Sequence, residues 1–249
     1  KNFKNKRNVL IIAEVGVNHN GDEKIAIKLI NAAKKSGADI VKFQSFKTKD
    51  LISRSARKPR YISNNKSLVM KSQFEILEDL ELPDKLIKKI SIYCRKIGIE
   101  FLSSAFDIDS ISSLSKINLK RLKVPSGEIT NFPYLVELAR LKKPIILSTG
   151  MANINEVKKA INILNDNGID KKDITVLHCT TDYPTLIKDV NLSAMLTLKD
   201  KLAVKVGYSD HTEGTEISIA AASLGATVIE KHITLNKNLK GPDHSASLE

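Results

Sequence analysis

The sequence alternates eight short apolar segments with seven segments of helical periodicity, joined by polar turns. The apolar segments are rich in Val and Ile and bounded by turn residues, which is typical of buried strands. They cover residues 9–16, 38–46, 99–106, 121–127, 144–150, 174–180, 203–209 and 226–234. Helical patterns lie between them, at about 22–36, 74–97, 108–117, 132–142, 155–167, 191–200 and 214–224. Strands that alternate with helices form parallel sheets.

The number of units in a chain of this length selects among the parallel-sheet folds. Eight units within 249 residues favour closure into a (β/α)8 TIM barrel, which typically takes ~250 residues. An open dinucleotide-binding sheet would carry a G-x-G-x-x-G loop after its first strand, whereas this turn reads EVGVNHNGD. We therefore predict an α/β protein with one barrel domain over residues 1–249.

Capping residues mark several helix boundaries. Asp22 is expected to be the N-cap of the first helix, because its carboxylate can accept hydrogen bonds from free backbone N–H groups. Glycines stand where helical patterns end, at Gly37, Gly98, Gly168 and Gly225.

Two segments depart from the regular repeat. No helical pattern follows the eighth strand, so we expect the natural protein to continue beyond Glu249. The connection 47–73 is much longer than the 2–6 residues usual for such a loop, and it carries eight Lys and Arg residues against one acidic residue, Asp50. We predict a mobile basic flap over the carboxyl ends of the strands; the alternative is a solvated insertion.

Composition limits the protein class and its partners. With 42% hydrophobic and 27% charged residues the chain is globular, and it has no apolar run of ~20 residues to span a bilayer. Its only cysteines, Cys94 and Cys179, predict a cytoplasmic protein with two core thiols. The net charge of +12 favours an anionic partner or reflects a lysine-rich surface. With 12 aromatic residues and no Trp, stacking platforms are not evident, and we expect neither nucleic acid nor a membrane as partner.

Polar side chains at the carboxyl ends of barrel strands are the catalytic candidates. In chain order they are Glu14, Asn18, His19, Lys42, Gln44, Ser103, Ser104, Lys123, Ser126, Glu128, Ser148, Thr149, His178, Thr180, Thr181, Asp182, Tyr183, Ser209, Asp210, His211, Glu230 and His232.

Two lysines, Lys42 and Lys123, lie within apolar strands and should point into the barrel. A buried ammonium group needs an anion or a depressed pKa. Three explanations are open: a Schiff-base lysine, a pair of cations that binds a phosphate and a carboxylate, or an internal ion pair with Glu14 or Glu230. The accompanying hydroxyls of Ser104, Ser126 and Ser148 suit anion binding.

None of the five histidines (19, 178, 211, 232 and 244) lies on a predicted helix, and we expect functional roles for at least two. His211 and His232 follow or end adjacent strands and could share a divalent metal through neutral imidazoles; simple hydrogen bonding is the alternative. A metal there could polarise a substrate carbonyl.

At these positions the sequence resembles a known family. The segments IIAEVGVNHNGD, SGADIVKFQSFK, FLSSAFD, KVPSGEITNFPYL, KPIILSTGMA, LHCTTDYPT, VGYSDHT, IEKHITL and GPDHSASLE occur in order over residues 9–249. Together they resemble the bacterial sialic acid synthases, including legionaminate and pseudaminate synthases. The resemblance implies a barrel that condenses phosphoenolpyruvate (PEP) with an N-acylated amino-sugar aldehyde, giving a nine-carbon 2-keto acid and phosphate.

The resemblance also implies roles for residues that match the family motifs. The implied PEP pocket is Lys42, Ser104, Lys123, Ser126, Ser148 and Thr181. Thr181 departs from the common Asn, which puts its role in doubt. The implied sugar site is Glu14, Tyr183, Ser209 and Asp243, and the implied metal ligands are His211 and His232. Glu230 is expected to position or deprotonate the attacking water, and Glu14, Lys42 and Lys123 complete the expected catalytic set.

The main prediction is an N-acetylneuraminate synthase acting on N-acetylmannosamine. The alternatives are an N,N'-diacetyllegionaminate synthase acting on the 2,4-diacetamido-6-deoxy analogue, another PEP-dependent keto-acid synthase, and a non-catalytic anion-binding barrel. The resemblance implies Mn2+ as the metal, with Mg2+ or Co2+ possible, and a homodimer for the full-length protein. Family members carry a C-terminal antifreeze-like domain that gives the partner's sugar site an arginine. The sequence shows no such domain, so we expect this chain to bind PEP and metal but to turn over poorly.

Overall fold

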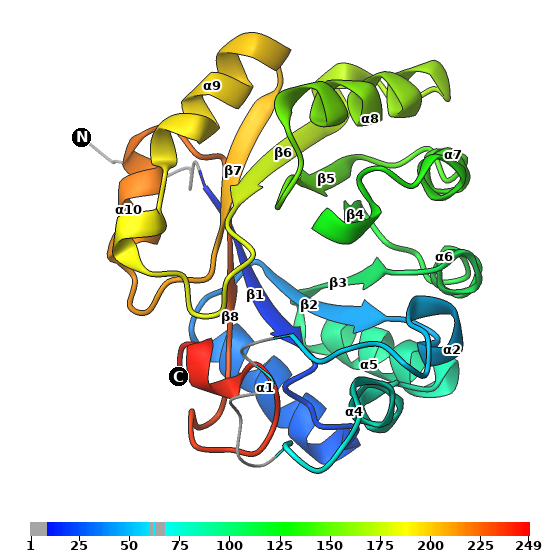
Figure 1. The fold of residues 1–249 in the computed structure, drawn as a ribbon. Coiled ribbons are helices and arrows are strands. Elements are labelled where there is room, and N and C mark those ends of the chain that lie inside the picture. Colours follow the sequence, from blue (N-terminus) through cyan, green and yellow to red (C-terminus); the bar gives the residue numbers. More distant parts are fainter. Residues whose placement is uncertain (1–8, 60–61, 63–67) are drawn as a thin grey trace.

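Eight parallel strands close into a barrel in sequence order (Figure 1). The computed structural model describes residues 9–59, 62 and 68–249. The strands are β1 Leu10–Gly16, β2 Ile40–Ser45, β3 Glu100–Ala105, β4 Leu122–Val124, β5 Ile145–Ser148, β6 Ile174–Cys179, β7 Lys205–Asp210 and β8 Val228–His232. This confirms the predicted TIM barrel.

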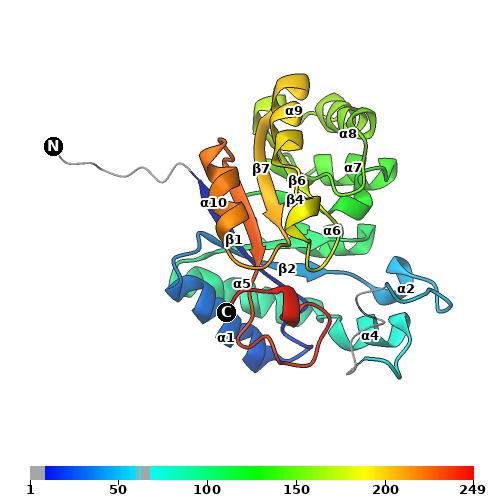
Figure 2. The ribbon, with the colours of Figure 1, turned by 60° about the vertical axis from the view of Figure 1, so that its left-hand side comes forward.

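Helices surround the barrel, as Figure 2 shows from a second direction. They are α1 Glu23–Lys35, α2 Thr48–Leu51, α4 Gln73–Leu80, α5 Asp84–Ile97, α6 Ile108–Ser115, α7 Phe132–Ala139, α8 Ile154–Asp166, α9 Leu192–Leu202 and α10 Glu216–Ser223. The predicted caps are confirmed at two helices: Asp22 accepts from the backbone N–H groups of Lys24 and Ile25, and Gly98 ends α5 in the left-handed conformation at φ 72°. No helix in the described ranges is long and apolar enough to cross a membrane.

The barrel interior changes from apolar to polar along the strands. An apolar floor is formed by Ile12, Ile40, Leu102, Ile146, Leu177 and Val228, which form one buried cluster. Because side chains on a strand alternate between faces, the residue two positions later also points inward. Those next inward residues are Glu14, Lys42, Ser104, Ser148, Cys179 and Glu230. The floor therefore excludes water below, and the polar groups gather at the carboxyl ends of the strands.

A larger apolar core lies between the barrel and its helices. The outward side chains of β1 and β2, such as Val15, Val41 and Phe43, are fully buried in it. On α1 the side chains at helical spacing, Ala26, Leu29, Ile30 and Ala33, pack into the same cluster. This core fixes the strands from outside, so that their inward polar residues are held in register.

The helix predicted over 74–97 is wrong: the structure has two helices there, α4 and α5. Pro83 disfavours helical backbone at Leu82, which precedes it, and Pro83 itself becomes the N-cap of α5. The freed Glu81 carboxylate accepts hydrogen bonds from the backbone N–H of Thr48 (2.9 Å) and from Lys47 Nζ (3.3 Å). The break thus ties α4 to the start of the long connection after β2.

The described part of that connection packs against the barrel. Ile62 and Phe46 form a buried cluster with Val17 and with Ile76 and Leu80 of α4. Residues 60, 61 and 63–67 lie outside the described ranges, so the mobility of the predicted basic flap is untested.

As expected, no α-helix follows β8 in this chain, and the segment after it folds back over the barrel end (Figure 2). The backbone N–H of Leu248 donates to the carbonyl of His232 (2.9 Å), and the side chain of Asn18 donates to Ser247 Oγ (2.9 Å). A single 3-10 turn, His244–Ala246, lies in this segment.

Candidate active site

A cavity of about 270 Å³ opens at the carboxyl ends of the strands. It is lined by Glu14, Lys42, Gln44, Ser104, Phe106, Lys123, Pro125, Ser126, Gly127, Ser148, Met151, Cys179, Thr181, Tyr183, Ser209, His211, Glu230 and His232. Every residue to which the family resemblance gives a role is in this set except Asp243. Of the other candidates at the strand ends, Gln44 is in the set, whereas Asn18, His19, Ser103, Glu128, Thr149, His178, Thr180, Asp182 and Asp210 are not. The structure therefore brings together side chains that are up to about two hundred positions apart in the chain.

Strand register explains why these side chains meet. Glu14 of β1 lies opposite Lys42 of β2 on one side and opposite His232 of β8 on the other. In the same way Ser104 pairs with Lys123, and Ser209 pairs with Glu230. Each pair is fixed by backbone ladders, so these side chains are held in place by the strands of the barrel.

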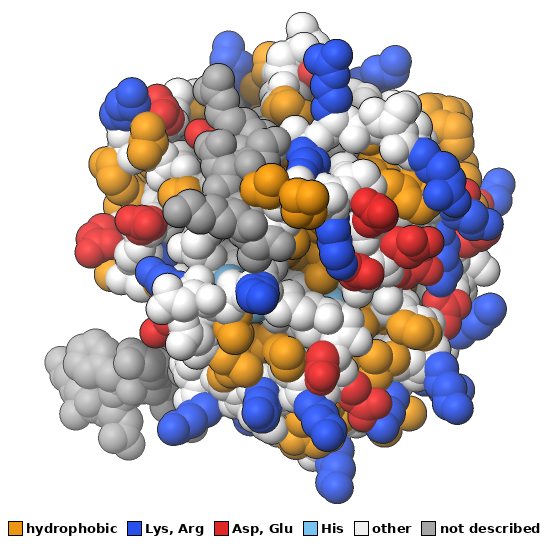
Figure 3. All heavy atoms as spheres, turned by 60° about the horizontal axis from the view of Figure 1, so that its bottom comes forward, with side chains coloured by type: hydrophobic (Ala, Val, Ile, Leu, Met, Phe, Trp, Pro, Cys, Tyr) orange, Lys and Arg blue, Asp and Glu red, His pale blue; other side chains and the backbone are white. Residues whose placement is uncertain are grey.

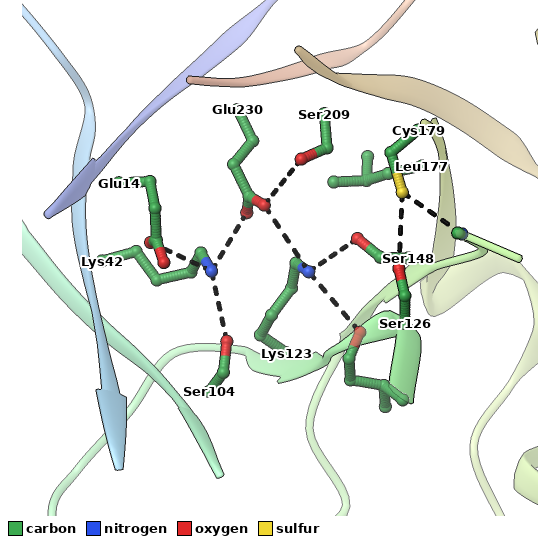
Figure 4. Close-up of polar contacts among 12 residues, drawn as sticks. Glu14, Lys42, Ser104, Lys123, Ser126, Ser148, Leu177, Cys179, Ser209 and Glu230 are labelled. Carbon is green, nitrogen blue, oxygen red and sulfur yellow. Dashed lines mark hydrogen bonds and ion pairs between the residues drawn. The ribbon is translucent and has the colours of Figure 1, made fainter. Parts of the chain in front are cut away.

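Two ammonium and two carboxylate groups alternate across the cavity (Figure 4). Lys42 Nζ lies 3.0 Å from Glu14 Oε2 and 3.5 Å from Glu230 Oε2, and Lys123 Nζ lies 3.6 Å from Glu230 Oε1. Both lysines are only 3% exposed. The inward placement predicted for them is confirmed, and the internal ion pairs considered from the sequence are present.

Hydroxyl groups complete the surroundings of each ammonium group. Lys42 donates to Ser104 Oγ (3.2 Å), and Lys123 donates to Ser148 Oγ (2.7 Å). Ser209 donates to Glu230 (3.0 Å). Paired cations and hydroxyls can bind the oxygens of a phosphate or carboxylate group. Such an anion would compete with Glu14 and Glu230 for the two ammonium groups.

The two carboxyl groups have opposite pKa shifts. Burial raises the pKa of Glu14 to about 7, because the single ammonium of Lys42 only partly offsets the loss of water. Burial would also raise the pKa of Glu230, but Lys123 and Lys42 outweigh it and lower the value to about 2. Near neutral pH, Glu230 is therefore a fixed anion and Glu14 is the group that can gain or lose a proton.

The two lysines also differ. Burial opposes the charge on Lys42, but Glu14 and Glu230 outweigh it and raise the pKa of that lysine. For Lys123, burial is the larger effect, and the neighbouring Lys42 adds to it, so its pKa is lowered despite Glu230. An incoming anion near Lys123 would therefore satisfy the less well compensated cation.

His211 and His232 lie side by side at the edge of the cavity, with ring centroids 5.8 Å apart. The Nδ1 atom of His211 is 2.6 Å from the carbonyl of Thr180, which only accepts, so Nδ1 carries the proton and Nε2 has the free lone pair. Burial lowers the pKa of both imidazoles, to about 3 for His232. Neutral imidazoles are metal ligands.

These two residues fit a divalent metal in part. The Nδ1 atom of His232 is buried and has no hydrogen-bond partner among the described residues, as expected of a nitrogen that can coordinate a metal. Within the described ranges, no group of three or more His, Cys, Asp or Glu side chains is placed to hold a metal. A metal at His211 and His232 would thus take its other ligands from water or substrate.

Tyr183 lies over this pair. Its ring centroid is 4.2 Å from that of His211 and 5.9 Å from that of His232. The backbone N–H of Thr185 donates to the carbonyl of His211 (2.8 Å), which fixes the loop that carries Tyr183.

The remaining histidines lie elsewhere. His178 faces away from the barrel interior, toward a separate cavity bordered by Thr149 and Asn191. His19 accepts from the N–H of Gly21, and His244 is hydrogen-bonded to Thr234. Two of the five histidines therefore line the candidate site.

Asp243 is also outside the cavity lining. It is buried in the turn before the 3-10 helix His244–Ala246, where its backbone carbonyl accepts from Ser247 Oγ (2.7 Å). Burial raises its pKa to about 6. A sugar contact at Asp243 needs a rearrangement of this turn or a ligand that reaches past the described cavity.

Gln44, a sequence candidate two residues after Lys42, lines the cavity and donates to Glu14 (3.2 Å). Among the features not assigned to the site from sequence are Cys179 and Gly16. Cys179, predicted as a core thiol, is buried but lines the cavity, where it accepts from the N–H of Gly150 (3.2 Å). Gly16 has a φ of 53°, and a Cβ there would lie 3.2 Å from His232 and 3.3 Å from Gln44 and Glu14, so its lack of a side chain keeps this corner open.

Sequence comparisons identify the family. The sequence model of the NeuB family matches residues 29–249. The N,N'-diacetyllegionaminic acid synthase of Campylobacter jejuni is 54% identical over 243 residues, which cover 98% of this chain and 72% of the relative. This chain belongs to the NeuB family. It is an enzyme of the PEP-dependent nonulosonic acid synthase type, as the sequence predicted.

Two further comparisons refine the placement within the NeuB family. The N,N'-diacetyllegionaminic acid synthase of Legionella pneumophila is 48% identical over 241 residues, covering 96% of this chain and 67% of the relative. The crystal structure of an N-acetylneuraminic acid synthetase from Leptospira borgpetersenii superposes with a TM-score of 0.84 at 32% identity, covering 97% of this chain and 78% of that chain. The higher identities favour the legionaminate alternative over our main prediction of an N-acetylneuraminate synthase.

Proposed function

We propose that this NeuB-family enzyme condenses PEP with a 2,4-diacetamido-6-deoxy hexose to form N,N'-diacetyllegionaminic acid and phosphate. The observation that carries the chemistry is the meeting of two buried ammonium groups and two neutral imidazoles in one cavity. The substrate choice is supported by relatives of 54% and 48% identity that bear this name.

In this proposal, PEP binds across the two lysines. Lys123 with Ser148 and Ser126 holds one anionic end of PEP, and Lys42 with Ser104 holds the other, because each set combines a cation with hydroxyl donors. Thr181 lines the same part of the cavity. Binding of PEP replaces the ion pairs with Glu14 and Glu230 in part, and Glu14, whose pKa is about 7, can take up a proton when it loses Lys42.

His211 and His232 would hold a divalent metal, which NeuB-family enzymes generally use; we propose Mn2+, with Mg2+ or Co2+ as substitutes. When bound, the cation supplies Lewis-acid polarisation of the sugar aldehyde. Tyr183, Glu14 and Ser209 border the space beside the imidazoles and orient the sugar there.

The reaction joins the methylene carbon of PEP to the aldehyde carbon of the sugar. Water then adds to the enol carbon, which has become electron-poor, and phosphate leaves with the oxygen that linked it. Glu230 is a carboxylate at neutral pH and accepts from Ser209, so it is placed to hold the water and to stabilise positive charge at that carbon. The aldehyde oxygen becomes a hydroxyl group when the new carbon–carbon bond forms. Glu14, with a pKa of about 7, can supply the proton to that oxygen or take it back.

We further propose that the barrel of residues 1–249 is the catalytic domain and that the full-length protein works as a homodimer. The catalytic prediction is tested by incubating the full-length protein with PEP, Mn2+ and a panel of acylated amino sugars, followed by mass measurement of the products. We expect the diacetamido sugar to give a product heavier than the sugar by one pyruvate. Glu230→Gln should abolish product formation, while Lys158→Met on the exposed face of α8 should not. Preferred turnover of N-acetylmannosamine would return the assignment to N-acetylneuraminate, and no product from any sugar would refute the proposal.

The Schiff-base explanation of the lysines is separately testable. In this structure both amines are engaged with carboxylates and hydroxyls, so we expect no imine. Treatment with pyruvate or PEP and borohydride should leave the protein mass unchanged. A covalent adduct mapped to Lys42 or Lys123 would contradict anion binding as their role.

A further inference from the structure

A buried ion pair that the proposed mechanism does not use lies behind the cavity wall. Asp210 at the end of β7 and Lys231 of β8 are neighbours in the ladder, and Lys231 Nζ is 3.0 Å from Asp210 Oδ2. Asp210 is 1% and Lys231 is 8% exposed. Neither lines the cavity, and strand alternation points both away from the barrel interior. The helix α10 packs on β7 and β8 (Figure 2).

Strand alternation places this ion pair between site residues on both strands. Ser209 and His211 flank Asp210, and Glu230 and His232 flank Lys231. All four of these neighbours line the cavity. Any shift of the ion pair therefore moves residues on which the proposed metal and water positions depend.

The ion pair also fixes the backbone around His211. Asp210 Oδ1 accepts from the backbone N–H (2.9 Å) and the hydroxyl (2.7 Å) of Thr212, and Lys231 Nζ donates to the carbonyl of Thr212 (2.7 Å). Ser218 of α10 donates to Asp210 Oδ2 (2.5 Å). Residue 212 is thus held at its N–H, its hydroxyl and its carbonyl, immediately after His211.

The same contacts extend to the tyrosine above the imidazoles. Thr212 forms a parallel bridge with Thr185, whose N–H donates to the carbonyl of His211 (2.8 Å). Thr185 follows the Tyr183-Pro184 pair, and the Tyr183 ring lies over His211. The buried ion pair of Asp210 and Lys231, on the outer face of the barrel strands, therefore supports both His211 and the loop that carries Tyr183.

We propose that Asp210 and Lys231 are positioning residues that hold His211 and His232 in the geometry that binds the divalent metal. This inference rests on the proposed function, because that function assigns the two imidazoles to a metal. Neither residue touches substrate or metal; they act through the backbone of Thr212 and through the strand ladder.

The test measures Mn2+ binding to the 249-residue chain, without PEP or sugar, from the electron paramagnetic resonance signal of free Mn2+. Asp210→Asn and Lys231→Met are expected to weaken Mn2+ binding by roughly 10- to 100-fold, the range found for residues that orient metal ligands. Lys231→Arg keeps the positive charge, so it should retain most of the Mn2+ affinity that Lys231→Met loses. Ser218→Ala keeps the ion pair and should weaken binding only a few-fold.

The matched control is Glu100→Gln, which breaks the Glu100–Arg121 pair (2.7 Å) at the opposite end of the barrel. It should lower the melting temperature without changing Mn2+ affinity. If circular dichroism shows that Lys231→Met or Asp210→Asn does not fold, the inference is tested with Ser218→Ala and Lys231→Arg instead. An Mn2+ affinity equal to wild type in Ser218→Ala would then count against the inference.

The outcomes separate this inference from the proposed function. If the wild-type chain binds Mn2+ and the folded variants bind it equally well, the positioning role is wrong and the metal site stands. If Glu100→Gln weakens binding as much as Lys231→Met, the effect is one of general stability and the inference fails. If the wild-type chain binds no Mn2+, the metal site and this inference fail together, whatever product formation shows.

Discussion

Glu14 and Glu230 show how the barrel gives two identical side chains different chemistry. Both are buried beside Lys42, but only Glu230 also faces Lys123. The second ammonium group separates their pKa values, to about 7 and about 2. A difference of one cation within about 4 Å thus decides which carboxyl group can exchange protons near neutrality.

Anion binding should therefore be coupled to proton uptake by Glu14. An anion that binds at Lys42 draws that ammonium away from Glu14 and adds a negative charge nearby, and both effects raise the Glu14 pKa above about 7. At about pH 8 the PEP phosphate is already ionised, so isothermal titration in buffers of different ionisation enthalpy should show proton uptake by the protein. Glu14→Gln should remove this buffer dependence while keeping the shape of the side chain. Buffer-independent binding by the wild-type chain would contradict the prediction.

The raised pKa of Glu14 also predicts a pH dependence of stability. The pKa of Glu14 is about 7 in the folded chain against an ordinary value of 4.5, so the folded state holds the proton more tightly. The contribution of Glu14 to stability is fully present below about pH 4.5 and is lost as the pH rises through 7. Urea unfolding at about pH 5 and pH 8 should show that Glu14→Gln gains stability relative to wild type at the higher pH. An equal difference at both values would show that the pKa is not raised.

At the scale of single elements, capping chemistry fixes where helices begin and Pro83 fixes where one ends. Local signals identified most of these boundaries, since a cap depends on residues within a few positions. The break between α4 and α5 shows the limit of periodicity alone: the apolar spacing runs through Glu81–Pro83, but proline geometry interrupts the helix.

The capping box of α8 gives a quantitative prediction. The Asn153 side chain accepts from the N–H groups of Asn155 and Glu156, and Glu156 accepts from the N–H of Asn153. Asn153→Ala should lower the free energy of unfolding by about 1 kcal/mol, because two backbone donors lose their acceptor. Asn155→Ala, an exposed asparagine in the same first turn, is the control and should change stability by less than about 0.5 kcal/mol. Equal effects in chemical denaturation would contradict a specific capping contribution.

At the scale of the whole molecule, the barrel separates stability from chemistry along its axis. The apolar floor contributes packing, and the polar layer above it contributes the charges of the site. On the face in Figure 3, the Lys and Arg side chains of the described residues are spread among acidic and apolar ones. This distribution supports a solvated surface on that face better than a single binding patch for nucleic acid.

The floor should therefore tolerate little loss of volume. Leu102 is fully buried there among Ile12, Ile40 and Leu177. Leu102→Ala should lower the free energy of unfolding by about 2–5 kcal/mol, because it leaves a cavity in a closed interior. Ile92→Ala on α5, where the side chain is 54% exposed, should cost less than about 1 kcal/mol. Urea unfolding measures both, and similar losses would argue against a packed barrel floor.

Sequence by itself determined the alternation of strands and helices, the closed barrel and the inward direction of Lys42 and Lys123. It also identified the polar residues of the cavity, within a longer list of candidates. These follow from local periodicity and from the rule that barrel sites form at the carboxyl ends of strands. The family resemblance narrowed these candidates to polar residues that line the cavity, apart from Gln44, and added Asp243, which lies outside the lining.

Only the tertiary structure decided which of these residues interact. Strand register places Lys42 between two glutamates but Lys123 beside one, and the pKa difference between Glu14 and Glu230 follows from those distances. It also turns His178 outward, keeps Asp243 out of the cavity lining and joins Asp210 to Lys231. The physical reason is that electrostatic energies depend on separations of a few ångströms between side chains from different strands, and these are set by packing of the whole barrel.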